Sequence, residues 1–467
     1  MSIRVLILSL LVTGLSIYAW KDWFKSLCGL IIMMAVLENR DVPTAIMGIP
    51  GLNLWNALFV MIVLAWAVNR GREGLVWDMP RGVGVLLLLY LGVVVVGVVR
   101  AIFDRGQMQG YPLGSLINEE LVNTVKWVLP GILLFDGVRT RRRVITALIC
   151  ILIPYVLIAV QVVRFMPLSA ALGDAAVLER SRISLGRYIN YTAVNISAML
   201  AGASWGILTT LALLRTKKLK VVVLAPVLVV VLGQALTGGR AGYLAWAATG
   251  LVLCLLKWRR YLLVVPVIAV VVPILMPGVV DRIFLGFGET SPSGESTVDR
   301  RVVTSGRADM WPLVIDKIGE SPWFGHGRQA MRRTGLTAET TLELGEPFAH
   351  PHCMYLETLL DNGLLGSLPI FLFWGTIVAY ALTLFRSGNH LYSAAGGLAL
   401  ALTLAQLFAG IGAQHFYPRS ITLGWWAAVF LMLRVYVEEK QAELRLTIVE
   451  GSWSPPVNEW QAAHVSP

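Results

Sequence analysis

Charged residues are scarce in this chain: Asp, Glu, Lys and Arg make up 14% of its 467 residues, whereas an ordinary soluble domain has about 25%. The deficit excludes a water-soluble globule, because hydrophobic residues account for 56% and the mean hydropathy is +0.70. It also excludes intrinsic disorder, since disordered chains are poor in apolar residues. The 44 glycines follow no triplet period, which excludes a collagen-like protein. The composition therefore predicts a polytopic membrane protein.

Cysteine is also rare. Three of the four cysteines, Cys28, Cys150 and Cys254, lie inside apolar runs, so no disulfide framework is expected. The fourth, Cys353, has no defined base beside it, and such a lone thiol is more often inert than nucleophilic. No Cys, His and Glu cluster has the spacing of metal ligands. We therefore expect no metal and no other cofactor.

Long apolar runs dominate the sequence, and about 20 consecutive apolar residues cross a bilayer as a helix. We predict twelve or thirteen spans, because the run 24–38 is short. The candidates are 3–19, 24–38, 52–68, 82–103, 121–137, 144–166, 190–213, 219–236, 241–257, 261–277, 363–385, 392–413 and 420–437.

Basic loops set the predicted topology. Lys and Arg gather after the third, fifth, seventh and ninth spans, in 70–81, 139–143, 215–220 and 257–260. All four loops fall on one side by parity, and the positive-inside rule makes that side cytoplasmic. Much of the formal net charge of +11 is thus explained by insertion into a lipid bilayer, and we expect no nucleic-acid partner.

The predicted organisation has four parts. They are ten spans in 1–277, one large outer loop in 278–362, the C-terminal spans in 363–437, and a polar cytoplasmic tail in 438–467 that we expect to be disordered. The loop contains a helix-like run from about 305 to 319 and is expected to be mostly helical. The fold class is therefore an all-α polytopic membrane protein with one large outer loop.

Arginines also gather on the predicted outer side. Long loops translocate regardless of charge, so most of these arginines are expected to be merely solvated. Arg240 and Arg187 are harder to explain in this way, because each lies at the mouth of an apolar helix, where a guanidinium needs a partner or a water-filled cavity. Arginine binds phosphate and pyrophosphate through two parallel hydrogen bonds. Their position suggests a lipid-linked phosphate or pyrophosphate ligand.

Four of the six histidines lie on the same side, and two of them form the pair His350-Pro-His352 directly before a span. Histidine is the side chain best suited to proton transfer near neutral pH. A pair at this spacing across a proline is a poor helical metal site. A helix-capping or solvated role is an equally good interpretation from the chemistry alone.

Three glycine motifs bring the backbone close to a neighbour: Thr237-Gly-Gly-Arg240-Ala-Gly, Gly325-His-Gly327 and Gly363-Leu-Leu-Gly366. Small residues in membrane proteins usually indicate helix–helix contact, which is the interpretation we favour. None of the motifs has the spacing of a phosphate-binding loop or of a dinucleotide-binding fingerprint.

Four segments around the large loop carry a resemblance. They are Thr237–Leu244, Ser305–Trp311, Ser321–Gly327 and His352–Gly366. In this order they resemble the O-antigen ligase / O-antigen polymerase superfamily of bacterial envelope glycosyltransferases. The resemblance covers roughly 180–385, and the preceding residues match only as a series of hydrophobic spans.

The ligase pattern has His, then Asn, Ser or Gln, nine residues, Gly, two residues and Gly. The spacing is met here by His352, Gly363 and Gly366, while Cys353 departs from the pattern at its second position. The family's element of Arg, three residues and Leu matches Arg240 to Leu244, and its loop arginine matches Arg307.

The resemblance implies a GT-C-like enzyme of the bacterial inner membrane with its site facing the periplasm. Such an enzyme moves a glycan from undecaprenyl pyrophosphate to an acceptor, which is lipid A-core, another repeat unit or a protein. His352 would be the catalytic base, and Arg240 and Arg307 would bind the pyrophosphate. Arg182 and Arg187 are further candidates for the same role. The supporting residues we predict are His350, Tyr355, Gly363 and Gly366.

The residues themselves agree with these roles. An attacking hydroxyl must lose a proton, for which His352 is suited, and arginines stabilise the charge that develops on a leaving pyrophosphate. No paired carboxylates stand out in the loop, so we predict metal-independent, direct displacement with inversion. Ligase and polymerase share this layout, and the histidine spacing favours ligase. The alternative of another class is a secondary transporter of an anionic solute, which would place polar residues at mid-membrane.

Overall fold

The computed structural model describes residues 3–37, 42–43, 45–46, 49–51, 53–108, 110–173, 175–189, 191–287, 289–290 and 296–452. Within these residues the regular structure is helical apart from two small antiparallel ribbons. One pairs β1 (Ala45–Ile46) with β2 (Ile49–Pro50), and the other pairs β3 (Glu289–Thr290) with β4 (Ser296–Thr297). The prediction of an all-α polytopic membrane protein is confirmed.

Every predicted span coincides with a helix. In chain order these are α1 (Ile3–Ala19), α2 (Trp23–Leu37), α3 (Leu54–Arg70), α4 (Arg81–Phe103), α6 (Asn123–Gly137), α7 (Arg141–Phe165), α10 (Ala193–Thr210), α11 (Lys217–Leu236), α12 (Arg240–Leu256), α13 (Val265–Leu275), α19 (Met354–Arg386), α20 (His390–Ala409) and α21 (Leu423–Ser452). In the described part of the chain, 7 helices are long and apolar enough to cross a membrane alone, or 8 if a bent pair near α13 is one span. The count of twelve or thirteen stays a prediction.

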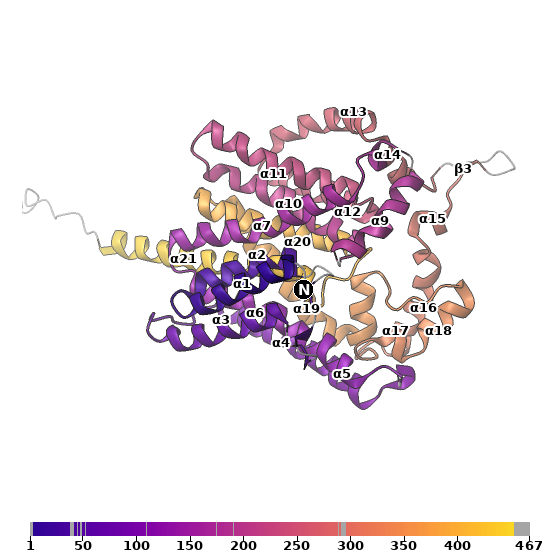
Figure 1. Cartoon of the computed structure of the whole chain (residues 1–467), viewed down its shortest axis with the longest axis horizontal. Coiled ribbons are helices and arrows are strands. Elements are labelled where there is room, and N and C mark those ends of the chain that lie inside the picture. Colours follow the sequence, from indigo (N-terminus) through magenta and orange to yellow (C-terminus); the bar gives the residue numbers. More distant parts are fainter. Residues whose placement is uncertain are drawn as a thin grey trace, which may run out of the picture.

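Shorter elements connect these helices. They are the 3-10 helices η1 (Gly106–Met108), η3 (Leu211–Leu213), η4 (Arg259–Val264) and η5 (Ser420–Thr422), the π-helix η2 (Ile117–Val122), and α5 (Leu113–Leu116), α8 (Ser169–Leu172), α9 (Ala175–Ile189), α14 (Pro277–Phe284), α15 (Arg300–Thr304), α16 (Arg307–Glu320), α17 (Ala330–Arg333) and α18 (Leu336–Leu344). Figure 1 shows the long helices side by side, with α15 to α18 gathered at one end. We call this the loop end of the bundle.

Polar caps begin several of the long helices. The side chains of Thr140, Thr192, Thr216 and Asn389 accept hydrogen bonds from backbone N–H groups in the first turns of α7, α10, α11 and α20. Such caps satisfy donors that a helix leaves without an internal partner. These residues therefore fix where the apolar runs start as helices.

The centre of the bundle is formed by α20 and α21, whose apolar stretches are mostly buried, whereas only about a third or less of the apolar stretches of α4 and α11 is buried. Small residues let the central helices approach closely. A Cβ added to Gly202 of α10 would lie 2.9 Å from the Cα of Leu402 in α20. This is the helix–helix contact that small residues provide in membranes.

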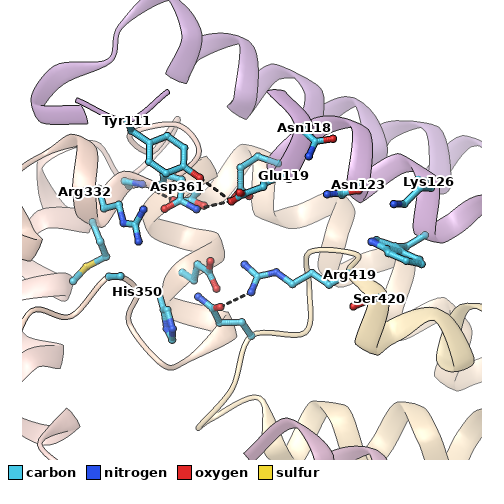
Figure 2. A pocket seen from close by; sticks show the side chains of 18 of the residues that line it. Tyr111, Asn118, Glu119, Asn123, Lys126, Arg332, His350, Asp361, Arg419 and Ser420 are labelled. Atoms are coloured by element: carbon cyan, nitrogen blue, oxygen red, sulfur yellow. Dashed lines mark hydrogen bonds between the residues drawn. The ribbon is translucent and has the colours of Figure 1, made fainter. Parts of the chain in front are cut away.

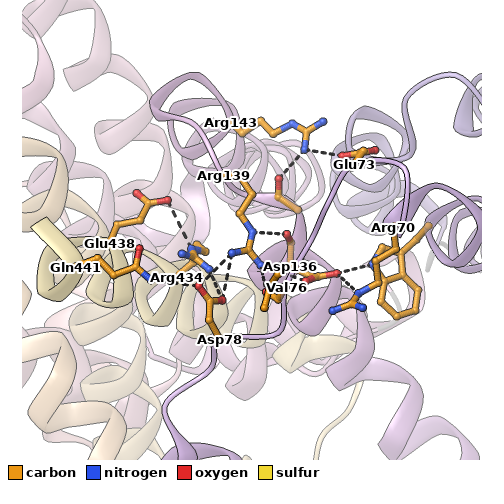
Figure 3. A network of polar contacts seen from close by, with 12 residues as sticks. Arg70, Glu73, Val76, Asp78, Asp136, Arg139, Arg143, Arg434, Glu438 and Gln441 are labelled. Carbon is orange, nitrogen blue, oxygen red and sulfur yellow. Dashed lines mark hydrogen bonds and ion pairs between the residues drawn. The ribbon is translucent and has the colours of Figure 1, made fainter.

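Ion pairs join the ends of several helices opposite the loop end (Figure 3). Asp78 pairs with Arg139 at 3.2 Å and with Arg434 of α21 at 2.6 Å. The fully buried Asp136 pairs with Arg70 at 2.8 Å and with Arg139 at 3.2 Å. The loops after α3 and α6 and the middle of α21 thus meet at one end, in agreement with the predicted parity.

Two boundaries differ from the predicted organisation. Helix α19 begins at Met354, before the predicted end of the loop at 362, and contains a break at Gly363, where φ is 63° and ψ is −169°. Helix α21 continues to Ser452, so the chain is helical beyond the predicted start of the tail at 438. The rest of that tail, 453–467, lies outside the described residues.

Candidate functional site

The histidine pair forms a tight turn just before α19. The ring centroids of His350 and His352 are 3.9 Å apart, and the backbone N–H of His352 donates to Nδ1 of His350 over 3.3 Å. His352 has a φ of 51°, a left-handed backbone conformation that is uncommon for a residue other than glycine. The indole N–H of Trp311 donates to the carbonyl of Pro351 at 3.0 Å. The loop helix α16 and the turn therefore hold the two imidazoles together.

The environment keeps both imidazoles neutral. Burial is the main cause that lowers the pKa of His350 to about 4, and nearby arginines, Arg419 first, lower it further. Burial likewise lowers the pKa of His352 to about 3, with contributions from His350 and Arg307. A neutral imidazole has a free nitrogen lone pair at neutral pH, although a pKa this low makes it a weak proton acceptor in the ligand-free protein.

These low pKa values predict a pH dependence of stability. In the unfolded chain the histidines have the ordinary pKa of 6.5, so between pH 6.5 and 4 the unfolded state binds protons that the folded state does not. The free energy of unfolding is therefore highest above pH 6.5. It falls as the pH is lowered toward the pKa values that the two histidines have in the folded protein. We expect the thermal midpoint to fall between pH 6.5 and 5, and to fall less in a His350→Gln/His352→Gln double variant. An identical fall in both proteins would contradict the assignment.

Arg307 is the first residue of α16 and lies beside this turn. The left-handed Gly306, with a φ of 76°, directs the chain into the helix. A Cβ added to Gly412 would lie 3.0 Å from Nη1 of Arg307, so the glycine leaves room for the guanidinium. Burial lowers the pKa of Arg307, the positive charge of Arg182 lowers it further, and Cys353 has a small opposing effect. Among the described residues, no carboxylate forms an ion pair with Arg307.

Arg240 opens α12 and is held by backbone oxygens. Its Nη1 donates to the carbonyl of Leu285 at 3.0 Å, and its Nη2 donates to the carbonyl of Val302 at 2.7 Å and to Oγ of Ser305 at 3.2 Å. Val302 and Ser305 lie just before Arg307 in the loop, and Leu285 directly follows α14. Within the described part of the chain Arg240 also has no ion-pair partner.

Two further arginines share one carboxylate. Oε2 of Glu179 lies 3.1 Å from Nη1 of Arg182 and 2.5 Å from Nη2 of Arg282. Nε of Arg282 donates to the carbonyl of Gly238 at 3.4 Å. A Cβ added to Gly238 would lie 3.1 Å from Cδ of Arg182. The glycine turn before α12 therefore contacts both arginines.

We call Arg182, Arg240, Arg282 and Arg307 the arginine cluster. The positive charges of these arginines repel one another. The charge of Arg182 interacts with those of the other three, and the charge of Arg240 also interacts with that of Arg282. In the part of the chain that the structure describes, Glu179 is the one carboxylate that pairs with the cluster. The cluster thus carries more positive charge than its own ion pairs neutralise.

Two predicted site residues have other surroundings. Arg187 is exposed near the end of α9, and no described contact joins it to the arginine cluster. The hydroxyl of Tyr355 donates to the carbonyl of Leu407 at 2.8 Å, so it is occupied by a bond between α19 and α20. Sequence reasoning did not select Arg282 for the site, although it is one of the arginines of the predicted loop.

The glycines of the motifs allow a loop to cross α19 at its break. Four backbone hydrogen bonds of 2.7–3.1 Å join 322–327 to 360–365. A side chain on Gly325 would clash with the backbone nitrogen of Gly363, and one on Gly363 would clash with the Trp323 backbone. Gly325 and Gly363 therefore allow close contact between a loop and a helix. The sequence-based interpretation favoured a helix–helix contact.

A buried arginine lies just after this crossing, and the sequence patterns did not single it out. Arg328 is 2% exposed and pairs with Glu120 at 2.6 Å, Glu357 at 2.9 Å and Asp361 at 2.7 Å. Its guanidinium carbon also lies 3.5 Å from the ring centroid of Tyr417. A signal was present: Glu357 and Asp361 are one helical turn apart at the start of an apolar span.

A polar cavity of about 560 Å³ borders the histidine turn. Figure 2 shows His350 and Arg332 at one part of its wall, Arg419 and Ser420 at a second, and side chains of η2 and α6 at a third. His350 lines it, whereas neither His352 nor any arginine of the cluster is among its lining residues. The π-helix η2 contributes Asn118, Glu119 and Glu120, and π-helical turns are frequent at functional sites.

No group of three or more His, Cys, Asp or Glu side chains arranged to hold a metal ion occurs among the described residues. The apolar helices and the polar groups gathered at the loop end define a multi-pass membrane protein whose polar site lies at one end of its bundle.

Residues 224–371 match the family model of O-antigen ligases, so this stretch of the chain is similar to that family. The match includes Arg240, Arg282, Arg307 and both histidines, whereas Glu179 and Arg182 lie outside it. No curated protein matches the chain.

Proposed function

We propose that the protein is an inner-membrane glycosyltransferase that moves a glycan from undecaprenyl pyrophosphate to an acceptor hydroxyl at the periplasmic face. The observation that carries the proposal is a neutral histidine pair directly beside an arginine cluster with surplus positive charge. The family match supports a glycosyltransferase-like enzyme of this kind.

The arginine cluster fits the donor. A pyrophosphate diester carries two negative charges, and guanidinium groups bind phosphate oxygens through paired hydrogen bonds. Arg307 and Arg240 have no ion-pair partner among the described residues, so their charge is available to such a ligand. As the bond to the sugar breaks, the leaving pyrophosphate gains charge, which fixed cations stabilise.

The histidine turn fits the proton transfer. In the proposed step the acceptor oxygen forms a bond to the anomeric carbon, and the electron pair of the broken bond leaves with the pyrophosphate. The acceptor proton passes to a neutral imidazole, for which we propose His352 because its spacing to Gly363 and Gly366 meets the ligase pattern and its ring lies against His350 of the cavity wall. Attack from the side opposite the leaving group inverts the anomeric centre, and no metal takes part in this step.

The polar cavity fits the acceptor sugar. In-line displacement requires the acceptor to approach from the side of the sugar opposite the pyrophosphate, and His350 lines the cavity while no arginine of the cluster does. Amide groups of Asn118 and Asn123 and the ring of Trp127 also line it. Amides donate and accept hydrogen bonds, so they suit the hydroxyls of a sugar.

The acceptor distinguishes a ligase from a polymerase, and the spacing of His352, Gly363 and Gly366 favours a ligase whose acceptor is lipid A-core. A polymerase of the same superfamily would use a second repeat unit instead. The purified protein, given the lipid-linked donor and each acceptor in turn, is expected to release undecaprenyl pyrophosphate with one of them. Solute uptake into proteoliposomes without any product would overturn the enzyme assignment in favour of a transporter.

An Asn118→Ala/Asn123→Ala variant tests the place of the acceptor. Each lost amide removes about 0.5–1.5 kcal/mol of hydrogen bonding, so we expect the acceptor KM to rise about fivefold or more while the donor KM is unchanged. Asn69→Ala, at the opposite end of the bundle, is the matched control and should change neither constant. An unchanged acceptor KM would place the acceptor elsewhere, and a raised donor KM alone would assign the cavity to the donor glycan.

A further inference from the structure

One carboxylate oxygen already occupies an anion position inside the arginine cluster. Oε2 of Glu179 contacts both Arg182, at 3.1 Å, and Arg282, at 2.5 Å. The two arginine side chains are 12% and 7% exposed, whereas the Glu179 side chain is 38% exposed. The cations are therefore fixed in the protein, and the carboxylate approaches them from the more accessible side.

The cations keep unused hydrogen-bonding capacity in this arrangement. Nε of Arg182 is buried and has no hydrogen-bond partner in the described structure. Arg282 is anchored independently of Glu179 through the carbonyl of Gly238. Removal of the carboxylate would thus leave Arg282 anchored through Gly238 and both guanidinium groups open to another anion.

We propose that Glu179 is a resident counter-ion of the pyrophosphate site: its carboxylate holds the place of a phosphate oxygen in the empty protein and is displaced when the donor binds. The inference rests on the proposed function, since it presupposes a pyrophosphate ligand. In this role Glu179 sets how tightly the pyrophosphate site binds anions. Glu179 lies outside the stretch that matches the family model.

A counter-ion role and a structural role of Glu179 predict opposite changes in the affinity of the site for anions. A displaced carboxylate competes with the ligand and repels it, so it weakens anion binding, including that of the product. A purely structural ion pair between α9 and α14 would instead help to form the site. Removing the Glu179 charge should therefore tighten binding in the first case and weaken it in the second.

The test measures binding of undecaprenyl pyrophosphate to the purified full-length protein in nanodiscs. Removing one nearby negative charge from an accessible, partly screened site should lower the Kd of Glu179→Gln about three- to tenfold. Glu179→Ala removes the same charge and serves as the second variant, with folding checked by circular dichroism. Glu320→Gln is the matched control: Glu320 pairs with Lys317 at 2.8 Å on the surface of α16 and contacts no arginine of the cluster.

Tighter binding in both Glu179 variants, with the control unchanged, supports the counter-ion assignment. An unchanged or raised Kd in the variants overturns it and leaves the proposed function intact. The proposed function fails separately if the wild-type protein does not bind undecaprenyl pyrophosphate or forms no product from the lipid-linked donor.

Discussion

Replacing His352 with alanine is expected to lower kcat for glycan transfer by about 10²–10⁴-fold, the usual contribution of a general base, with little change in the donor KM. The imidazole is neutral at working pH because burial first, and then His350 and the positive charge of Arg307, lower its pKa to about 3. Its loss removes the proton acceptor from the step without removing a cation that binds pyrophosphate. The measurement is steady-state release of undecaprenyl pyrophosphate in the presence of acceptor.

His350→Ala should behave differently, because His350 borders the cavity proposed for the acceptor. We expect a raised acceptor KM and a smaller fall in kcat. His390→Ala, on the exposed first residue of α20, is the matched control and should leave both constants unchanged. If His350→Ala abolishes turnover and His352→Ala does not, the base is His350.

Arg328→Met is expected to destabilise the protein strongly. The substitution leaves Glu120, Glu357 and Asp361 buried without their common cation. Breaking a buried ion pair by removing one partner costs about 3–5 kcal/mol. Thermal unfolding in detergent, followed by circular dichroism, should show a clearly lower midpoint.

A second substitution distinguishes the electrostatic cause from a simple loss of packing. Adding Glu120→Gln to Arg328→Met removes one of the unpaired charges and should recover part of the lost stability. Arg386→Met, at the exposed end of α19, is the control and should unfold like the wild type. A double variant no more stable than the single one would show that the packing of the guanidinium matters more than its charge.

Periodicity and charge predicted the fold well because they act locally. Each apolar run became a helix, since a backbone in lipid must satisfy its own hydrogen bonds. The basic loops after α3 and α6 meet at one end because membrane insertion depends on their charge. The predicted Arg240, Arg307 and His352 all lie at the loop end, and their roles remain proposals.

Contacts between distant segments could not be derived from local patterns. Arg328 and Glu120 are far apart in the sequence, and most of the N-terminal helices lie between them. No sequence pattern near either residue indicates that the two form an ion pair. Nothing in the sequence distinguishes Arg282 from the solvated arginines of the loop. In the structure, α14 places Arg282 against Glu179. Gly325 and Gly363 each signalled a close approach, but one sequence does not show that they approach each other.

The loop crossing has a consequence for how the protein can be divided. Arg100 of α4 donates to the carbonyls of Phe324 and Gly325, at 2.5 and 2.9 Å, and the backbone N–H of Arg328 donates to the carbonyl of Gly97 at 3.0 Å. The stretch that carries the family signature therefore completes its hydrogen bonding only on helices that precede it. It is therefore not an autonomous folding unit. In a fragment that begins after α4, the backbone groups of Phe324, Gly325 and Arg328 would lose their hydrogen-bond partners on α4.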